Sequence, residues 1–321
     1  MKTAFITGIT GQDGSFLAEL LLEKGYQVVG LVSKKHGIGE TNIEGIKDKV
    51  ILEPGDLLDK ASLARIIKKH KPQEIYNLGG ITFVPQSWEN PELTFKVNAL
   101  GPLKILEIIR DNLPQAKFYQ ATSAKIFGNP KVGPQDEDTP IEPNTPYAVS
   151  KAAAHFLVKN FRDHFNLFAV SGILYNHESE RRGEDFVTRK ITLGAAKIKL
   201  GQEKNITLGS LEAEQDWGYA PDYVEAMYLM LQHKIPKDFI IATTKLYSVK
   251  DVCQIAFSHL GLNWEKYIKM AKKFVRKEEA SSFFGDASKA KQLLGWQPKV
   301  NFEEMIKKMV QNDLKLLKGG S

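Results

Sequence analysis

Cysteine is almost absent from this sequence, with Cys253 as the only example among 321 residues. A single thiol excludes an internal disulfide and any metal site built from several cysteines, a pattern typical of a reducing compartment. Cys253 falls in an apolar helical pattern with Val249, Val252 and Ala256, so we expect it to be a core thiol. We expect no metal site in this protein.

Long apolar runs are also missing. No stretch is long enough to span a bilayer, and the first residues lead into a strand without the features of a signal peptide. We therefore expect a cytoplasmic protein with no membrane partner.

Neither sign of charge dominates the sequence, because 44 Lys and Arg stand against 38 Asp and Glu, for a net charge of +6. The lysines are dispersed among acids, and no basic stripe interleaved with aromatic residues is present. This pattern favours a solvated surface over a nucleic-acid-binding face, so we expect no nucleic-acid partner. The length and the 42% hydrophobic content suit one large or two ordinary domains.

A glycine-rich turn opens the chain. Residues 3–6 form a predicted strand that leads into the segment TGITGQDG at residues 7–14, and a predicted helix follows. Strand, glycine turn and helix are the context of a dinucleotide-binding loop, in which the positive end of the helix faces the phosphates. The spacing is G-x-x-G-x-x-G instead of G-x-G-x-x-G, and a plain turn is the alternative. We predict a cofactor-binding loop made of Gly8, Gly11, Gln12, Asp13 and Gly14.

The second predicted strand, residues 27–32, ends without the acid that usually binds the ribose 2′-hydroxyl of NAD. Ser33, Lys34 and Lys35 follow instead. Two ammonium groups would suit the 2′-phosphate of NADP, although lysines are also common in exposed loops. We therefore predict NADP(H) as the cofactor, with these three residues near its adenosine ribose.

Strands and helices continue to alternate through the first half of the chain. Predicted strands at 50–52, 74–78 and 117–121 are separated by predicted helices at 61–70 and 92–111. This order implies an α/β fold of the Rossmann type, a doubly wound parallel sheet covered by helices on both faces. Ligands then bind at the carboxyl ends of the strands, where we expect cofactor contacts from Asp56, Leu57, Leu78 and Gly79.

Tyr147 and Lys151 are the pair most directly related to chemistry. They are four residues apart in a predicted helix, so they share one face and lie one turn from each other. An ammonium near a phenol favours the phenolate and lowers its pKa from about 10. Such a phenol exchanges a proton with a sugar hydroxyl near neutral pH. Taken alone, a pair with this spacing is more often part of a helix surface.

Several motifs together resemble the extended short-chain dehydrogenase/reductases: the glycine-rich loop, the pair Tyr147 and Lys151, and a strand end at residues 121–123. Later motifs resemble the GDP-mannose 4,6-dehydratase family. They are YNHESERRG at 175–183, FVTRK at 186–190, Leu208-Gly209, and DWGYAPDYVEAM at 216–227. The likeness continues through residues 285–286 and 294–296 and covers most of the chain.

The resemblance implies a Rossmann domain with bound NADP and a smaller C-terminal lobe for a nucleotide-sugar, which we expect to be GDP-linked. We place the first at residues 1–170, completed by segments around 205–245, and the second mainly at 171–321. The family pairs subunits through helices, so we expect a homodimer or homotetramer in which helices 92–111 and 146–165 meet. The substrate contacts implied by the family are Ser87, Asn176, Val187, Lys190, Gly209, Gln215, Arg276 and Glu279.

The catalytic segment departs from the family pattern S-[ST]-S-E-[LM]-[YF]-G, in which the Glu takes part in the loss of water. Here residues 122–128 read TSAKIFG, so Ser123 keeps a hydroxyl for the sugar C4 oxygen, whereas Lys125 replaces the Glu and Ala124 precedes it. An ammonium with a pKa of about 10.4 cannot accept a proton at pH 7 unless its surroundings lower that pKa by several units. Gln215 likewise replaces an Arg that binds the diphosphate in the family.

These departures favour chemistry confined to hydride transfer at sugar C4. We predict an NADP(H)-dependent 4-ketosugar reductase or 4-epimerase, with Ser123, Tyr147 and Lys151 as catalytic residues and the role of Lys125 open. One alternative is a GDP-mannose 4,6-dehydratase with altered acid/base residues. Another is a catalytically silent NADP-binding regulator, which predicts loss of Tyr147 or Lys151, yet both are present.

Overall fold

Seven parallel strands form the centre of the molecule in the computed structural model, which describes residues 1–33, 40–271 and 283–319. The strand order is β11-β6-β5-β4-β1-β2-β3, and each neighbouring pair is parallel. The predicted doubly wound α/β fold is therefore confirmed. The strands are β1 (Thr3–Thr7), β2 (Gln27–Val32), β3 (Ile51–Pro54), β4 (Glu74–Asn77), β5 (Lys117–Ser123), β6 (Ala169–Leu174) and β11 (Phe239–Ile241).

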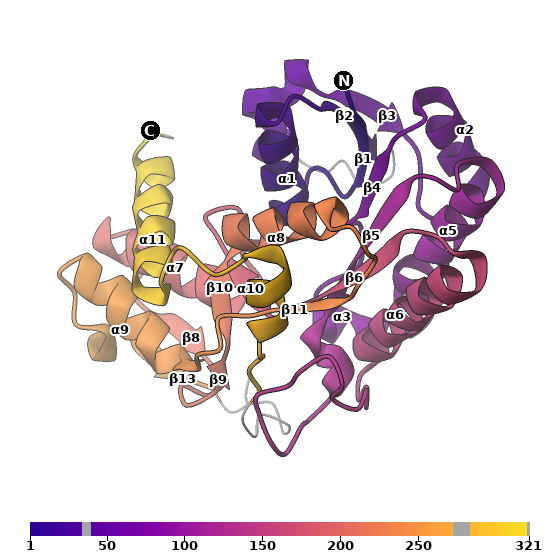
Figure 1. The fold of residues 1–321 in the computed structure, drawn as a ribbon. Coiled ribbons are helices and arrows are strands. Elements are labelled where there is room, and N and C mark those ends of the chain that lie inside the picture. The colour runs from indigo at the N-terminus through magenta and orange to yellow at the C-terminus, as the bar shows by residue number, and fades with distance from the viewer. Residues whose placement is uncertain (34–39, 272–282, 320–321) are drawn as a thin grey trace.

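Helices cover both faces of this sheet (Figure 1). One face packs against α1 (Gln12–Glu23), α8 (Ala220–Gln232) and α10 (Ser288–Leu294). The other face packs against α2 (Lys60–His70), α5 (Gly101–Asn112) and α6 (Pro146–Phe165). Because both faces are covered, the inner strands are continuously apolar or buried, as β1 and β6 are along their whole length.

The C-terminal lobe has a separate core between α7 (Val187–Lys199), α9 (Val249–His259) and α11 (Phe302–Gly319). Cys253 is buried there, as expected for a core thiol. Short strand pairs frame the lobe: β7 (Asn176–Glu178) with β10 (Trp217–Tyr219), β8 (Ile206–Leu208) with β13 (Ile268–Met270), and β9 (Glu214–Gln215) with β12 (Tyr247–Ser248). Of the segments around 205–245, α8 and β11 therefore join the large sheet region, whereas β8 does not.

The predicted helix at residues 92–111 is not continuous. The structure has α4 (Pro91–Phe95), a π-helical turn at Lys96–Leu100 and then α5, with α3 (Val84–Glu89) just before them. Pro102 has no N–H to donate to the carbonyl of Asn98, which breaks the regular helical pattern at this point. The Asn98 side chain is buried and exchanges hydrogen bonds with the backbone of Ile81. The break therefore ties the loop after β4 to the helix.

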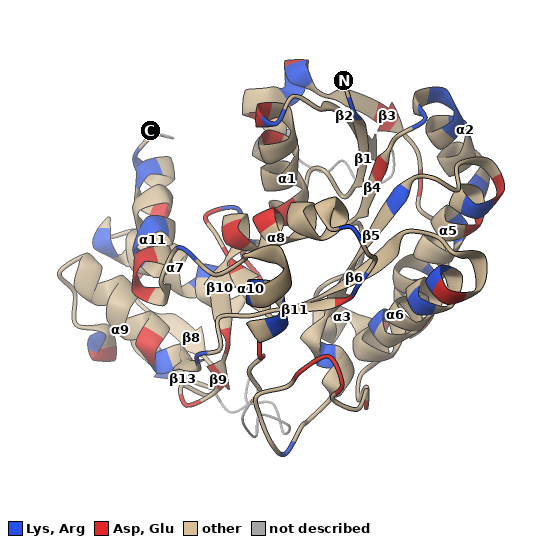
Figure 2. Ribbon diagram, in the orientation of Figure 1, with Lys and Arg blue, Asp and Glu red and all other residues tan. Residues whose placement is uncertain are grey.

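Charged residues of both signs are interspersed on the helices of both lobes (Figure 2). None of the helices in the described ranges is sufficiently long and apolar to cross a membrane. Within the same ranges, no cluster of three or more His, Cys, Asp or Glu has a metal-binding arrangement.

Candidate active site

The glycine-rich loop joins β1 to α1 at the carboxyl end of the sheet. A Cβ on Gly14 would lie 2.1 Å from the carbonyl oxygen of Gly8, and a Cβ on Gly8 would lie 2.8 Å from the nitrogen of Gly79. Gly8 also has a φ of +73°, which side chains rarely adopt. The N-cap of α1 is Gly11, which provides no capping side chain. A close-packed loop with an uncapped helix N-terminus fits the diphosphate of a dinucleotide.

The neighbouring strand ends complete this cradle. The Gly79 amide donates to Thr7 Oγ1 at 3.0 Å, and a Cβ on Gly79 would lie 2.9 Å from Leu57 Cδ1. Leu57, Leu78 and Gly79 thus meet beside the loop, and their contact with a cofactor stays a prediction. The carboxylate of Asp56 accepts a hydrogen bond from the Leu58 amide at 2.9 Å, so part of it serves a local turn. Ser33 directly follows β2, while Lys34 and Lys35 lie outside the described residues.

Ser123, Tyr147 and Lys151 come together at the end of β5. Thr145 caps α6 by accepting from the Ala148 amide, and the helix begins at Pro146, so Tyr147 lies in its first turn. The exposed fractions of Tyr147 and Lys151 are 7% and 4%. The Lys151 ammonium donates to the Ala121 carbonyl at 2.9 Å and lies 5.9 Å from the centroid of the Tyr147 ring. The predicted pair therefore faces the strand end instead of solvent.

Burial raises the pKa of the Tyr147 phenol, while a hydrogen bond from Ser123 and the charge of Arg182 act against that rise. The expectation that Lys151 lowers this pKa is wrong for this structure, since Lys151 is not among the causes of the shift and burial dominates. Burial also lowers the pKa of Lys151 to about 8, against the opposing charge of Asp13. At neutral pH the phenol is protonated and most Lys151 is an ammonium.

Lys125 lies in the 3-10 turn η3 (Ala124–Phe127), which follows Ser123 directly. The Ser123 hydroxyl accepts from the Lys125 amide at 3.2 Å. The Lys125 ammonium lies 4.1 Å from the centroid of the Phe283 ring. A cation over an aromatic face is stabilised in its charged form, so this contact does not prepare Lys125 to act as a base.

Asp13, His177 and Arg182 form an ionic group beside Tyr147 that the sequence reasoning did not assign to the site as a unit. His177 Nε2 lies 2.9 Å from the Asp13 carboxylate, and Arg182 pairs with Glu178 at 3.1 Å. Arg182 and Asp13 both act electrostatically on the Tyr147 phenol. The many charged residues in the motif at 175–183 indicated an ionic site in the sequence. They did not indicate that Asp13 on α1 is the partner of His177.

Residues predicted to bind the substrate gather on β7, α7, β8 and β9. The Asn176 amide donates to Gln215 Oε1 at 2.9 Å, and the Lys190 ammonium donates to the Thr207 carbonyl at 2.8 Å. Val187 is 36% exposed at the first turn of α7, and Gly209 directly follows β8. The Asn176–Gln215 contact places two neutral amides where the family resemblance implied a cation. Arg276 and Glu279 lie outside the described residues.

Ser87 has a different environment. It is buried in α3, and its hydroxyl donates to the Val84 carbonyl at 2.6 Å. The hydroxyl proton is therefore used within the helix, and substrate binding by Ser87 stays a prediction.

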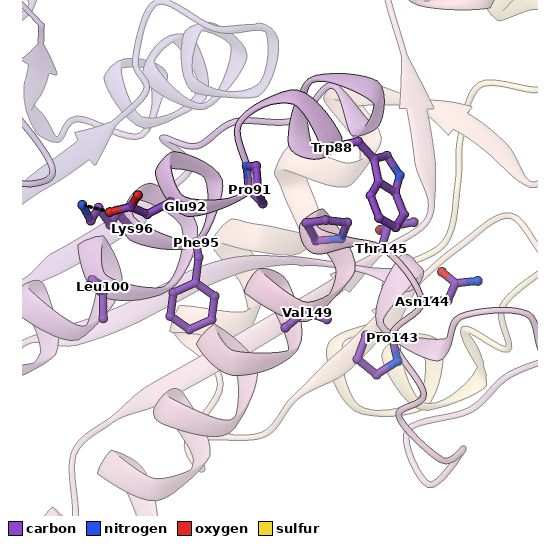
Figure 3. A pocket seen from close by; sticks show the side chains of 11 residues that line it. Trp88, Pro91, Glu92, Phe95, Lys96, Leu100, Pro143, Asn144, Thr145 and Val149 are labelled. Carbon is purple, nitrogen blue, oxygen red and sulfur yellow. Dashed lines mark hydrogen bonds and ion pairs between the residues drawn. The ribbon is translucent and has the colours of Figure 1, made fainter.

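A surface groove of about 710 Å³ lies on the outer side of α6 (Figure 3). Its apolar lining includes Trp88, Phe95 and Val149, which are exposed despite their size. The groove is not lined by Tyr147 or Lys151, which the same helix directs toward β5. It is therefore a separate surface from the catalytic group.

Comparison with known proteins agrees with the motifs. The sequence profile of the family described as GDP-mannose 4,6 dehydratase matches residues 5–309. GDP-mannose 4,6 dehydratase 1 of Arabidopsis thaliana is 46% identical over 329 residues, which covers 99% of this chain and 91% of that protein. GDP-mannose 4,6 dehydratase of Homo sapiens is 43% identical over 344 residues, with 99% and 92% covered.

Solved structures share the fold. UDP-glucose 4-epimerase from Thermotoga maritima, solved with UDP-glucose, has a TM-score of 0.87 at 25% identity and covers 98% of this chain and 99% of its own. The dTDP-glucose 4,6-dehydratase from Bacillus anthracis with NAD has a TM-score of 0.86 at 20% identity, covering 99% and 98%. RMD from Pseudomonas aeruginosa with NADPH has a TM-score of 0.82 at 19% identity, covering 98% and 100%. The family profile that matches residues 5–309, and the 46% and 43% identity to the Arabidopsis thaliana and Homo sapiens proteins, establish that this chain belongs to the GDP-mannose 4,6-dehydratase family.

Proposed function

We propose that the protein modifies a GDP-linked hexose by NADP(H)-dependent hydride transfer at sugar C4, as a 4-ketosugar reductase or a 4-epimerase. The single observation that carries this proposal is the group formed by Ser123, Tyr147 and Lys151 beside a segment in which Lys125 follows Ser123 by two residues. Solved structures with the same fold hold NAD or NADPH, which supports a nicotinamide cofactor. The preference for NADP(H) comes from the sequence after β2.

When bound, the nicotinamide supplies or accepts the hydride at C4. The chain contributes proton transfer and positioning. Tyr147, which burial keeps protonated at neutral pH, would donate its proton to the C4 oxygen as a 4-keto group is reduced. Ser123, which is bonded to the phenol, would hold the same oxygen. The Lys151 ammonium, which lies beside the end of β5, would hold the ribose of the nicotinamide.

Elimination of water needs a base at C5 and an acid for the leaving hydroxyl, and the described segments around Tyr147 do not supply them in a free form. Lys125 contacts the Phe283 ring, and Ala124 has no acid/base group. Two nearby carboxylates are held in ion pairs, Asp13 with His177 and Glu178 with Arg182. This arrangement supports C4 chemistry without dehydration.

A second candidate function is 4,6-dehydration itself, with altered acid/base residues. The observation in its favour is the extent of the family match, because the relatives named as GDP-mannose 4,6 dehydratases are 43% and 46% identical along 99% of this chain.

Mass spectrometry separates the two functions. The purified protein is incubated with GDP-mannose without added cofactor, and the mass of the sugar nucleotide is followed. We expect no loss of water. A new isomer of unchanged mass would identify an epimerase, and NADPH consumption with a GDP-4-keto-6-deoxyhexose would identify a reductase. Rapid loss of water would overturn the proposal in favour of dehydration.

A companion variant locates the missing step. Lys125→Glu combined with Ala124→Ser restores a carboxylate and a hydroxyl after Ser123. We expect this double variant to gain loss of water from GDP-mannose. Lys131→Glu is the control, because it makes the same charge change at an exposed position farther along the loop. Loss of water in the Lys131→Glu protein would mean that the gained activity does not depend on position 125.

We also propose that the groove on α6 is covered by a second copy of the chain. Phe95 and Val149 are 38% and 43% exposed, and they lie in the two segments, 92–111 and 146–165, that are predicted to meet in a homo-oligomer. Sedimentation analysis of the purified protein tests this assembly. We expect a dimer or tetramer that dissociates when Val149→Asp places a charge on this face, and a monomeric native protein would contradict the proposal.

A further inference from the structure

One face of helix α1 is joined to residues 177–181 by a row of polar contacts, which we call the α1 clamp. It consists of Gln12, Asp13, Ser15 and Glu19 on α1, and His177, Ser179 and Arg181 on the facing segment. Gln12, Ser15 and Glu19 lie at helical spacing on one side of α1. The partners are more than 160 positions apart in the sequence, so the clamp connects the glycine-rich loop to the C-terminal lobe.

The inner part of the clamp is an ion pair. His177 Nδ1 lies 2.8 Å from the Tyr175 carbonyl oxygen, and Nε2 lies 2.9 Å from the Asp13 carboxylate. Both partners only accept hydrogen bonds, so both ring nitrogens carry a proton and His177 is an imidazolium. Burial disfavours its charge, but Asp13 outweighs that cost and raises the pKa of His177. Burial likewise opposes the charge of Asp13, yet His177 lowers its pKa overall.

Other groups from every neighbouring element face this ion pair. The Tyr223 ring of α8 is stacked on His177, with ring centroids 4.7 Å apart. Arg182 disfavours the charge on His177, whereas it favours the charge on Asp13. Lys151 and Tyr147 of α6, and Tyr119 of β5, are affected by the charge of Asp13. The ion pair is thus embedded in the catalytic group while the clamp continues outward along α1.

The outer part of the clamp is formed by Arg181. Its guanidinium donates to Ser15 Oγ at 3.0 Å and to Glu19 Oε1 at 2.7 Å, and it lies 3.9 Å from the centroid of the Phe16 ring. Between the inner and outer contacts, the buried Ser179 hydroxyl donates to Gln12 Oε1 at 2.7 Å, and Gln12 donates to the His177 carbonyl at 3.2 Å. Alternate residues of the 177–181 segment, namely His177, Ser179 and Arg181, are therefore attached to α1.

We infer that the α1 clamp couples cofactor binding to nucleotide-sugar binding. This inference depends on the proposed function, in which the loop at 8–14 holds the dinucleotide and Asn176, Val187 and Lys190 border the sugar nucleotide. The clamp lies between these two regions. When one ligand orders α1, the clamp also orders residues 177–181, which begin the segment that binds the other ligand. The second ligand then binds without a further loss of conformational entropy in this region. By linkage, each ligand strengthens binding of the other by the same factor.

Titration calorimetry measures this coupling. The dissociation constant of GDP is determined for the full chain with and without saturating NADPH, and the ratio of the two constants is the coupling factor. We expect a factor of about 5 to 150 for the native protein, the usual range of coupling between two sites. Arg181→Met keeps packing on Phe16 but loses both polar contacts of the outer clamp. We expect its factor to fall toward one, with the affinity for NADPH alone changed less than about threefold.

Arg65→Met is the matched control. Arg65 forms an ion pair with Glu53 at 3.0 Å on α2, so the same substitution removes an ion pair from another helix of the Rossmann half. The coupling factor should remain native. Hydrogen exchange gives a second readout: NADPH should protect the amides of residues 177–181 in the native protein but not in Arg181→Met. Glu19→Gln removes the charge of the same ion pair from the α1 side and replaces Arg181→Met if that variant does not fold.

The outcomes distinguish the inference from the function on which it depends. If NADPH and GDP both bind the native protein with a coupling factor of one, the clamp has no coupling role and the proposed function stands. A native coupling factor in both Arg181→Met and Glu19→Gln would also overturn the inference. If neither ligand binds the native protein, the proposed function fails together with the inference.

Discussion

At the amino end of the central sheet, Glu74 begins β4 with a carboxylate that is 1% exposed, while at the carboxyl end Tyr147 and Lys151 are buried beside β5. The Glu74 carboxylate accepts hydrogen bonds from Tyr26 at 3.0 Å, Tyr76 at 2.8 Å and Gln232 at 3.1 Å. Lys2 forms an ion pair with it at 3.2 Å. Each oxygen of this buried charge is therefore satisfied within the protein.

The carboxyl end has fewer internal partners for its polar groups. Lys151 donates to the Ala121 carbonyl and Tyr147 is bonded to Ser123, while the buried Thr122 hydroxyl has no hydrogen-bond partner among the described residues. Buried polar groups normally have partners, and a shortage of them is costly. The amino end of the sheet is thus closed around a satisfied charge, whereas the carboxyl end, where open α/β sheets bind ligands, leaves a buried hydroxyl unpaired among the described residues.

The largest effect should come from Tyr147→Phe. Removal of the phenolic hydroxyl takes away the proton donor, so we expect the proposed C4 reduction to slow by about 10²- to 10⁴-fold. NADPH oxidation with a GDP-4-keto-6-deoxyhexose measures the rate. Thermal unfolding of the variant should remain close to native, because the hydroxyl that is lost has little structural role.

Tyr119→Phe is the matched control for that variant. The Tyr119 hydroxyl is fully buried and has no hydrogen-bond partner among the described residues. Its removal leaves no donor or acceptor unsatisfied, so the rate and the unfolding temperature should both stay near native. A rate loss in Tyr119→Phe equal to that in Tyr147→Phe would mean that general disturbance of the site, and not loss of a proton donor, explains the effect.

Lys151→Met should separate activity from stability. Since burial lowers the pKa of Lys151 to about 8, the ammonium is lost as the pH rises through 8, and the native rate should fall there. The variant should be slower by about 10²-fold at pH 7 and show no such fall. The unfolded chain binds more protons between the folded and unfolded pKa values, so native stability rises with pH in that window. At pH 7 the variant should therefore unfold at the same or a higher temperature than the native protein.

The glycine-rich loop, the Tyr147–Lys151 pair and the parallel sheet were predictable because each depends on local spacing or on the order of elements. The π-helical break at Lys96–Leu100 was not, although Pro102 marks its position in the sequence. The general pattern of apolar residues continues through the break and hides it.

The pKa of Tyr147 and the α1 clamp could not be derived from the sequence. Spacing gives the proximity of Lys151, but the burial that raises the phenol pKa depends on how α6 packs against β5. The pairing of Asp13 with His177 depends on the path of a chain segment 164 residues away. Sequence motifs named both residues without indicating their contact.

Tyr76→Phe tests the closed end of the sheet. The substitution removes one donor from the buried Glu74 carboxylate, so we expect a loss of about 1–3 kcal/mol in the free energy of unfolding. Urea unfolding measures this loss. The rate of C4 reduction in the folded protein should be unchanged, and a slower rate with native stability would contradict the division of roles between the two ends.

The smallest effect should come from Glu53→Gln on the edge strand β3, where a buried carboxylate is paired with cations that reach solvent. Lys69, His70 and Arg65 contact Glu53 at 2.5, 2.7 and 3.0 Å, and the hydrogen bond from Lys69 is the main cause that lowers the pKa of Glu53 to about 2. The side chains of Lys69 and Arg65 are 59% and 50% exposed. Solvent therefore screens their charges. We therefore expect a loss below about 1 kcal/mol in the free energy of unfolding at pH 7.

The pH dependence of this effect follows from the lowered pKa of Glu53. The stabilisation is present above the unfolded pKa of Glu and is lost as the pH falls toward 2, so variant and native stabilities should converge in acid. Urea unfolding at pH 7 and pH 3 measures both stabilities. If Glu53→Gln lost as much free energy of unfolding at pH 7 as Tyr76→Phe, solvent access to the cations would not weaken their pairing with a buried carboxylate.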